Sequence, residues 1–109
     1  MSHDEVVLKD ITRAVGLAIA FRQGMSKEEF MVDVKTQSAV LHQLLVIGEA
    51  VKRLSTSFRE EHPAVPWRDM SGMRDVLIHG YDIVDLEEVW KTVDTDLPGL
   101  LRILEEFAQ

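Results

Sequence analysis

Residues 33–59 read DVKTQSAVLHQLLVIGEAVKRLSTSFR, and this stretch decides the fold class of the chain. Its apolar residues recur at steps of three and four, which is the spacing that lines one face of an α-helix. We therefore predict one long helix across residues 33–59. Gly48 in its middle costs about 1 kcal/mol relative to alanine unless another backbone packs closely against it. We expect a close helix crossing at Gly48.

The sequence before this helix has the same period. Residues 4–22 place apolar side chains on one side and predict a first helix, which Gly24 ends as a C-terminal cap. Ser26 and Glu29 then stand in the S-x-x-E spacing of a capping box, in which each side chain accepts a backbone N–H of the other residue. This spacing predicts a short second helix that begins at Ser26.

Two further helical stretches follow the long helix. The dipeptides His62-Pro63 and Val65-Pro66 predict a loop, because a residue before proline avoids helical backbone angles. Residues 67–79 then predict a fourth helix, interrupted at Ser71-Gly72 and terminated by Gly80.

The last helix is expected to begin near Asp85, a good N-cap residue, and to run to about Phe107. Pro98 lies inside it, so we expect either a kink or a break at which Asp96 caps a new helix. No segment alternates with a period of two, as a β-strand would. The prediction is an all-α fold: a four- or five-helix, mostly antiparallel up-and-down bundle, in one domain spanning residues 1–109.

Charge is distributed unevenly along the chain. The net charge of -7 comes from 12 Lys and Arg against 19 Asp and Glu, which disfavours general binding to DNA or to anionic membranes. Residues 52–74 nevertheless hold five basic residues against three acidic ones, whereas residues 82–109 hold two against eight. We therefore expect any phosphate-bearing ligand near the middle of the chain, where Lys52, Arg53, Arg59 and Arg68 are candidates to hold an RNA backbone.

The chain contains no cysteine, which excludes disulfides and thiolate metal sites and suits a reducing cytoplasm. No apolar run approaches the roughly 20 residues of a membrane span, and no secretory leader opens the chain. The four histidines have no spacing typical of a metal site. We expect a soluble cytoplasmic protein that needs neither a metal ion nor another cofactor.

One short segment, residues 74–81, concentrates groups suited to chemistry on phosphodiesters. His79 can take and return a proton near neutral pH, and Arg74 carries a permanent charge that forks onto phosphate oxygens. Asp75 lies one helical turn before His79, and Gly80 allows Tyr81 to fold back towards the imidazole. The alternative is purely structural: Arg74 paired with a carboxylate, His79 half-buried in the core, and Tyr81 packed beside Trp90.

A family resemblance favours the first interpretation. Arg74, His79 and Tyr81 match the R-x4-H-x-Y signature of the HepT-like proteins, prokaryotic members of the HEPN superfamily (higher eukaryotes and prokaryotes nucleotide-binding). The run Ile47-Gly48-Glu49-Ala50 resembles the family's long-helix segment, and residues 66–73, PWRDMSGM, resemble its lead-in to the arginine. Trp90 and Asp96-Leu97-Pro98 resemble its final helix, so the resemblance covers nearly the whole chain.

The resemblance implies a HEPN-like bundle and a metal-independent endoribonuclease, the toxin of a type VII-like toxin–antitoxin system. Arg74 and His79 correspond to the catalytic pair, which acts on RNA at the cleft of a homodimer. Asp75 holds a position that is often Asn in relatives, where it supports the pair. Tyr81 corresponds to the tyrosine to which a cognate minimal nucleotidyltransferase antitoxin adds AMP.

Two other readings of the same bundle stay open. It can be a non-catalytic module that binds a nucleotide or docks a nucleotidyltransferase partner. It can also be a helical bundle without any activity, held together by packing alone.

Overall fold

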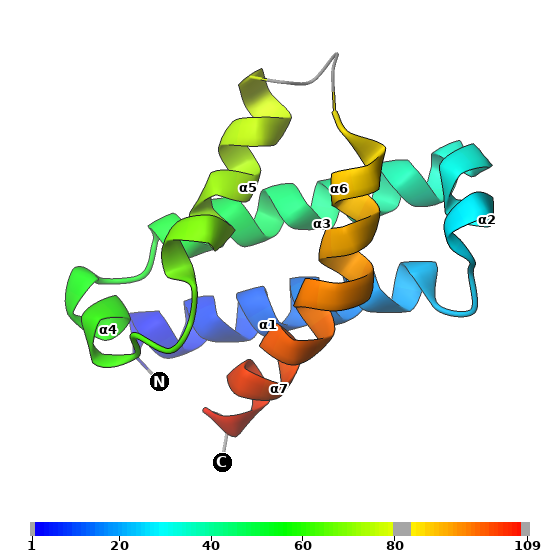
Figure 1. Cartoon of the computed structure of the whole chain (residues 1–109). Helices are drawn as coiled ribbons and strands as arrows, with labels where there is room; N and C mark the ends of the chain where they lie inside the picture. Colours follow the sequence, from blue (N-terminus) through cyan, green and yellow to red (C-terminus); the bar gives the residue numbers. More distant parts are fainter. Residues whose placement is uncertain (1, 80–83, 108–109) are drawn as a thin grey trace.

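The structure of the protein is a computed structural model that describes residues 2–79 and 84–107, and for residues 74–79 it describes the backbone without the side chains. All regular elements in these ranges are helical (Figure 1). In chain order they are α1 (His3–Arg22), α2 (Lys27–Val32), α3 (Val34–Lys52), α4 (Thr56–Glu61), α5 (Trp67–His79), α6 (Leu86–Lys91), the π-helical segment η2 (Thr92–Asp96) and α7 (Leu97–Glu106).

The long helices form two antiparallel pairs. Helices α1 and α3 lie side by side, and the pair formed by α5 and the run α6–η2–α7 crosses them (Figure 1). Helix α5 packs on α3, whereas η2 and α7 pack on α1. The short helices α2 and α4 lie at opposite ends of the first pair. This architecture confirms the predicted all-α bundle.

The core fills the space between these pairs with aliphatic side chains and Phe30. Gly48 is buried in α3, the helix that packs against both α1 and α5, as expected for a helix-crossing position. The largest side chains with less than 2% exposure are Phe30, Ile11, Ile47, Met70, Leu97 and Leu104.

Local capping signals in the sequence are confirmed. The Ser26 hydroxyl accepts the N–H of Glu29 at 3.1 Å, and the Glu29 carboxylate accepts the N–H of Ser26 at 2.9 Å. Gly24 follows α1 with φ of 74°, the left-handed conformation of a C-terminal cap. Asp85 caps α6 by accepting the N–H groups of Glu87 and Glu88. The backbone hydrogen bond from Ser26 also lowers the pKa of Glu29.

The prediction of one helix over residues 33–59 is wrong. Helix α3 ends at Lys52, and α4 begins after Ser55, whose backbone is extended and whose hydroxyl accepts the N–H of Phe58 at 3.1 Å. The Asp4 carboxylate accepts the N–H of Ser55 at 2.8 Å and its hydroxyl at 2.7 Å. Ser55 thus starts a new helix and is held there by the first turn of α1.

The predicted interruption at Ser71-Gly72 is wrong, and so is the alternative in which Asp96 caps a new helix before Pro98. Helix α5 passes through Ser71-Gly72 without interruption. The Ser71 hydroxyl donates to the carbonyl of Arg68, one turn earlier in the same helix, at 2.9 Å. Asp96 keeps helical angles and makes no capping hydrogen bond. The chain accommodates Pro98, which lacks an N–H, through the wider π-helical turn of η2 just before it.

Candidate functional site

Helix α5 carries the residues predicted to be catalytic. Its first half is fixed by burial: Met70 is 1% exposed and Trp67 is 7% exposed. The Trp67 indole N–H donates to the carbonyl of His62 at 2.9 Å, which ties the start of α5 to the preceding loop. The second half of α5 is therefore held at its base by a packed aromatic and a packed thioether.

Arg74, Asp75 and His79 all belong to the last two turns of α5. They are consecutive parts of one continuous helix, as the sequence predicted, although their side chains lie outside the description. Tyr81 falls outside the described residues. A five-residue spacing on a regular helix separates Arg74 from His79 by about 140° around the axis, whereas Asp75 and His79 lie one turn apart.

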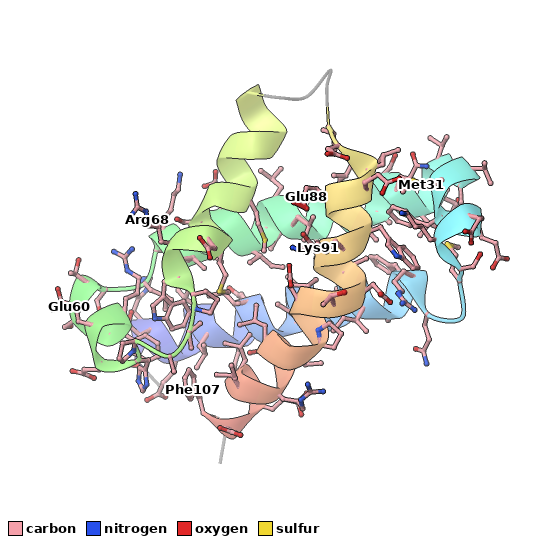
Figure 2. All side chains as sticks on the ribbon, in the orientation of Figure 1. Met31, Glu60, Arg68, Glu88, Lys91 and Phe107 are labelled. Atoms are coloured by element: carbon pink, nitrogen blue, oxygen red, sulfur yellow. The ribbon has the colours of Figure 1, made fainter. Side chains whose placement is uncertain are left out.

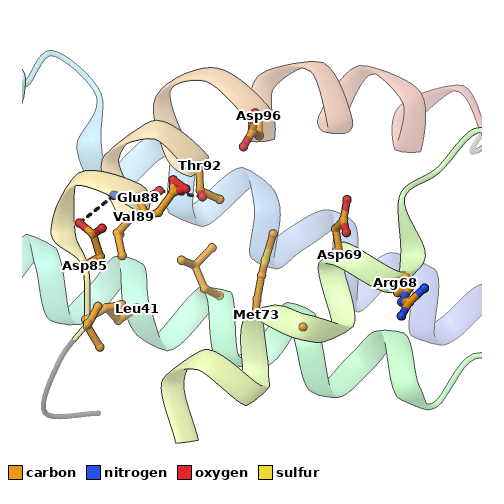
Figure 3. Close-up of a pocket in the computed structure, with 12 residues that line it drawn as sticks. Leu41, Arg68, Asp69, Met73, Asp85, Glu88, Val89, Thr92 and Asp96 are labelled. Carbon is orange, nitrogen blue, oxygen red and sulfur yellow. Dashed lines mark hydrogen bonds between the residues drawn. The ribbon is translucent and has the colours of Figure 1, made fainter. Parts of the chain in front are cut away.

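An open groove of about 630 Å³ lies beside the first half of α5, between α5 on one side and α6–η2 on the other (Figure 3). We call it the α5–α6 groove. Its floor is α3, which contributes Leu41 and Leu44, and Val89 on the opposite wall is 7% exposed. The described lining residues are Leu41, Leu44, Arg68, Asp69, Gly72, Met73, Val84, Asp85, Glu88, Val89, Thr92 and Asp96. Met73 directly precedes Arg74, so the groove and the predicted catalytic segment share one helix.

The edge of the α5–α6 groove is acidic. Among the side chains that the structure describes, four carboxylates and the guanidinium of Arg68 line it. Asp85 is engaged in capping α6, but Asp69, Glu88 and Asp96 are exposed, and their carboxylates form no hydrogen bond or ion pair with the side chains described in residues 2–73 and 84–107. The acidic C-terminal third that the sequence indicated thus forms one wall of the groove.

Of the basic residues proposed to hold RNA, Arg68 lines the groove, and the other three lie outside its described lining. Lys52 and Arg53 are exposed at the C-terminal end of α3, Arg59 is half-buried in α4, and Arg68 is exposed near the start of α5 (Figure 2). Arg53 lies 4.0 Å from the Asp10 carboxylate. Arg68 precedes His79 by eleven residues, or roughly 16 Å along the helix axis. These cations surround the base of α5 and not its last turns.

Ion pairs connect α6 and η2 to α2 and to the C-terminal end of α1. Lys27 donates to Glu87 at 2.7 Å, a contact that raises the pKa of Lys27. Arg22 pairs with Asp94 and stacks over the ring of Trp90 at 4.7 Å, and Trp90 in turn packs against Phe30 at 5.5 Å. Sequence reasoning missed both pairs because their partners are 60 and 72 residues apart, beyond the reach of any local pattern.

The remaining histidines have structural surroundings. His3 donates to the carbonyl of Arg53 at 3.0 Å. His62 stacks between Phe58 and Phe107, with 4.6 Å between ring centroids on each side. Among the residues the structure describes, no group of three or more His, Asp or Glu is arranged to hold a metal ion. No helix in those ranges is long and apolar enough to cross a membrane.

The fold and the motif define a small helical bundle with a candidate phosphodiester site on α5. Residues 11–107 match the model of the family described as ribonuclease HepT-like, and the chain belongs to that family.

Curated relatives agree with this assignment. The chain is 46% identical to "Probable ribonuclease HepT" of Thermococcus cleftensis, over 85% of this chain and 84% of the relative. It is 41% identical to a "Putative RNase" of Methanocaldococcus jannaschii over 91% of this chain and 82% of the relative. It is also 41% identical to a "Putative RNase" of Caldanaerobacter subterraneus over 80% and 78%. No solved structure matches the chain significantly.

Proposed function

We propose that this protein is an endoribonuclease that cleaves RNA without a metal ion, with Arg74 and His79 as its catalytic pair. The observation that carries the proposal is the R-x4-H segment on the last turns of α5 in a chain of the HepT-like ribonuclease family. The names of the relatives, which refer to ribonucleases, support the same substrate class.

The reaction follows from the two groups. The neutral imidazole of His79 takes the proton of a 2′-hydroxyl, and the freed oxygen attacks the neighbouring phosphorus. The bond to the 5′-oxygen breaks, and that oxygen takes the proton held by the His79 imidazolium, which yields a 2′,3′-cyclic phosphate and a 5′-hydroxyl end and restores the neutral imidazole. The Arg74 guanidinium stabilises the charge that builds on the non-bridging oxygens.

The spacing of the pair supports a site shared by two copies of the chain. Because Arg74 and His79 lie about 140° apart around a regular helix, a single α5 does not present both positions on one face. A homodimer in which two α5 ends face one cleft supplies an arginine and an imidazole from each side of the RNA.

Asp75 supports the pair as a positioning residue. It stands one turn before His79, the spacing at which a carboxylate can accept a hydrogen bond from an imidazole and fix its orientation. Its charge also lies close to the phosphate path. We therefore expect Asp75→Asn to keep the orientation and to remove the repulsion.

We further propose that the protein is the toxin of a two-gene module, and that a minimal nucleotidyltransferase neutralises it by adding AMP to Tyr81. Tyr81 follows His79 by two residues. An anionic adduct there would occupy the path of the RNA and offset the charge of Arg74.

The decisive experiment is cleavage of a labelled RNA in EDTA by the wild type and by His79→Ala, Arg74→Ala and His42→Ala. The last is the matched control, since His42 is exposed on α3. We expect the two site variants to lose about 100-fold or more of the rate and the control to lose none. Equal cleavage by all four proteins would remove Arg74 and His79 from catalysis.

The role of Tyr81 is tested separately, by co-expression with a minimal nucleotidyltransferase of the proposed kind. Intact-mass analysis should show AMP on the wild type and none on Tyr81→Phe, which should still cleave RNA. An adduct that persists on Tyr81→Phe would assign the modification to another residue.

A second candidate function is a non-catalytic module that binds a nucleotide or docks the nucleotidyltransferase. The acidic edge of the α5–α6 groove, close to the motif, favours it, because free carboxylates repel RNA. Binding of the nucleotidyltransferase by a protein that leaves RNA intact in the cleavage assay would establish this alternative.

A further inference from the structure

The α5–α6 groove has the shape of a helix-binding groove. Two helical walls, α5 and α6–η2, stand on a third helix, α3, and leave an open trough of about 630 Å³ between them (Figure 3). Grooves with apolar floors between helices are the usual seats of amphipathic helices, which insert side chains at every third or fourth residue. The volume also lies within the roughly 300–1,000 Å³ of typical ligand sites.

The floor of the groove is apolar and its edge is negative. Leu41 and Leu44 offer aliphatic surface at the bottom, Val89 adds to it from the α6 wall, and Met73 adds an unbranched thioether that adapts to different partners. Above them, the exposed carboxylates of Asp69, Glu88 and Asp96 have no partner among the described residues. An occupant that gains from both features must carry an apolar stripe flanked by Lys or Arg.

Charge selects among the possible occupants. An RNA strand would bring its phosphates against the carboxylates of Asp69, Glu88 and Asp96, which outnumber the one described guanidinium of the lining, that of Arg68. A second copy of this chain, with its own net charge of -7, would bring further negative charge. A basic polypeptide neutralises the edge and fills the floor in the same contact.

We infer that the α5–α6 groove is a docking site for a basic amphipathic helix of another protein. Because Met73 and Arg74 are neighbours on α5, a helix seated there covers the approach to the last turns of α5. Binding itself is independent of the proposed ribonuclease activity. The consequence, that an occupied groove inhibits cleavage, rests on that proposed function.

The test uses three synthetic peptides of about 18 residues, long enough for the i, i+3/i+4, i+7 anchors of a groove-bound helix. The first carries a leucine stripe flanked by lysines, the second has the same composition with the leucines scattered, and the third replaces each lysine with glutamate. Binding of each labelled peptide to the full-length protein is followed by fluorescence anisotropy. We expect the first peptide alone to bind, and more weakly as salt is raised.

Charge reversal places the binding in the groove. Glu88→Lys/Asp96→Lys should weaken binding of the first peptide at least about tenfold. The control Glu105→Lys/Glu106→Lys makes the same charge change on exposed residues of α7, outside the groove lining, and should change binding less than about twofold. Leu41→Ala removes part of the apolar floor and should also weaken binding. Circular dichroism of each variant verifies that the helices are intact.

Several results would overturn the inference. One is equal binding of the scattered or glutamate peptide, and another is an equal loss in the α7 control. A third is the absence of binding by the first peptide at about 1 mM, the affinity of a negligible contact. A change of oligomeric mass in Glu88→Lys/Asp96→Lys would instead assign the groove to contacts between copies of the chain. Because peptide binding is measured without RNA, an inactive ribonuclease would leave this result unaffected.

Discussion

The packing of α5 makes one stability prediction that can be worked through in numbers. Met70 is 1% exposed on the helix that carries the predicted catalytic segment. Truncation of a buried methionine to alanine removes its packed atoms and leaves a cavity, at a cost of about 2–5 kcal/mol. Alanine is itself the better helix former, so a loss measured for Met70→Ala comes from packing and not from helix propensity.

The matched control is Met73→Ala, one turn further along the same helix. Met73 is partly exposed and lines the α5–α6 groove, so fewer of its contacts are lost on truncation. We expect this change to cost less than about 1.5 kcal/mol. The two variants make the same chemical change at buried and half-buried positions of one helix.

Thermal and urea unfolding followed by circular dichroism measure both variants. A domain of this size loses about 4–8 °C in Tm per kcal/mol, so Met70→Ala should melt at least about 8 °C below the wild type. Its urea midpoint should fall with an unchanged slope. A loss below about 1 kcal/mol, or an equal loss in Met73→Ala, would refute the argument that the base of α5 is fixed by the burial of Met70.

Further predictions follow from the caps and hydrogen bonds. The backbone N–H of Ser55 lowers the pKa of Asp4, so the ionised carboxylate stabilises the fold above its unfolded-state pKa, and this stability is lost as the pH falls through the lower folded-state pKa. In urea unfolding at a series of low pH values, Asp4→Asn should reduce the dependence of the unfolding free energy on pH. The same pH dependence in Asp4→Asn and in the wild type would contradict the assignment. Asp85→Ala should cost about 0.5–2 kcal/mol by chemical denaturation, because Asp85 caps α6 through two N–H groups, whereas Asp96→Ala, at a position without a capping bond, should cost less.

The sequence predicted the fold where the signal was local. Periodicity located the long helices, and the capping pattern of Ser26 and Glu29 marked the start of α2 within one residue. The break at Ser55 was missed because the apolar spacing continues from Leu54 to Phe58, while the contact that fixes it comes from Asp4, 51 residues away. A local pattern indicates which conformation a segment prefers, but the break at Ser55 is fixed by the side chain of Asp4, which is distant in the sequence.

The sequence likewise predicted the local part of the candidate site and missed the part that depends on packing. The motif identified Arg74, His79 and Tyr81 as candidates and placed two of them on one helix, which the backbone of α5 confirms for Arg74 and His79. The α5–α6 groove had no signal in the sequence, because its lining comes from three helices whose packing no single segment encodes. The catalytic roles themselves remain predictions of the motif and the family.

The proposed RNA cleavage and the proposed docking of a basic helix require surfaces of opposite charge. A polyanionic substrate needs local positive charge in a chain whose net charge is -7, and Lys52, Arg53, Arg59 and Arg68 supply it around the base of α5 and the end of α3. Among the described side chains, the α5–α6 groove carries the carboxylates of Asp69, Glu88 and Asp96 without a partner, beside the guanidinium of Arg68, so it favours a basic partner over a polyanion. Salt should therefore weaken RNA binding and peptide binding alike, but lysines placed at Glu88 and Asp96 should strengthen RNA binding and weaken peptide binding at least about tenfold. A single pair of substitutions thereby separates the surface for RNA from the surface for a protein.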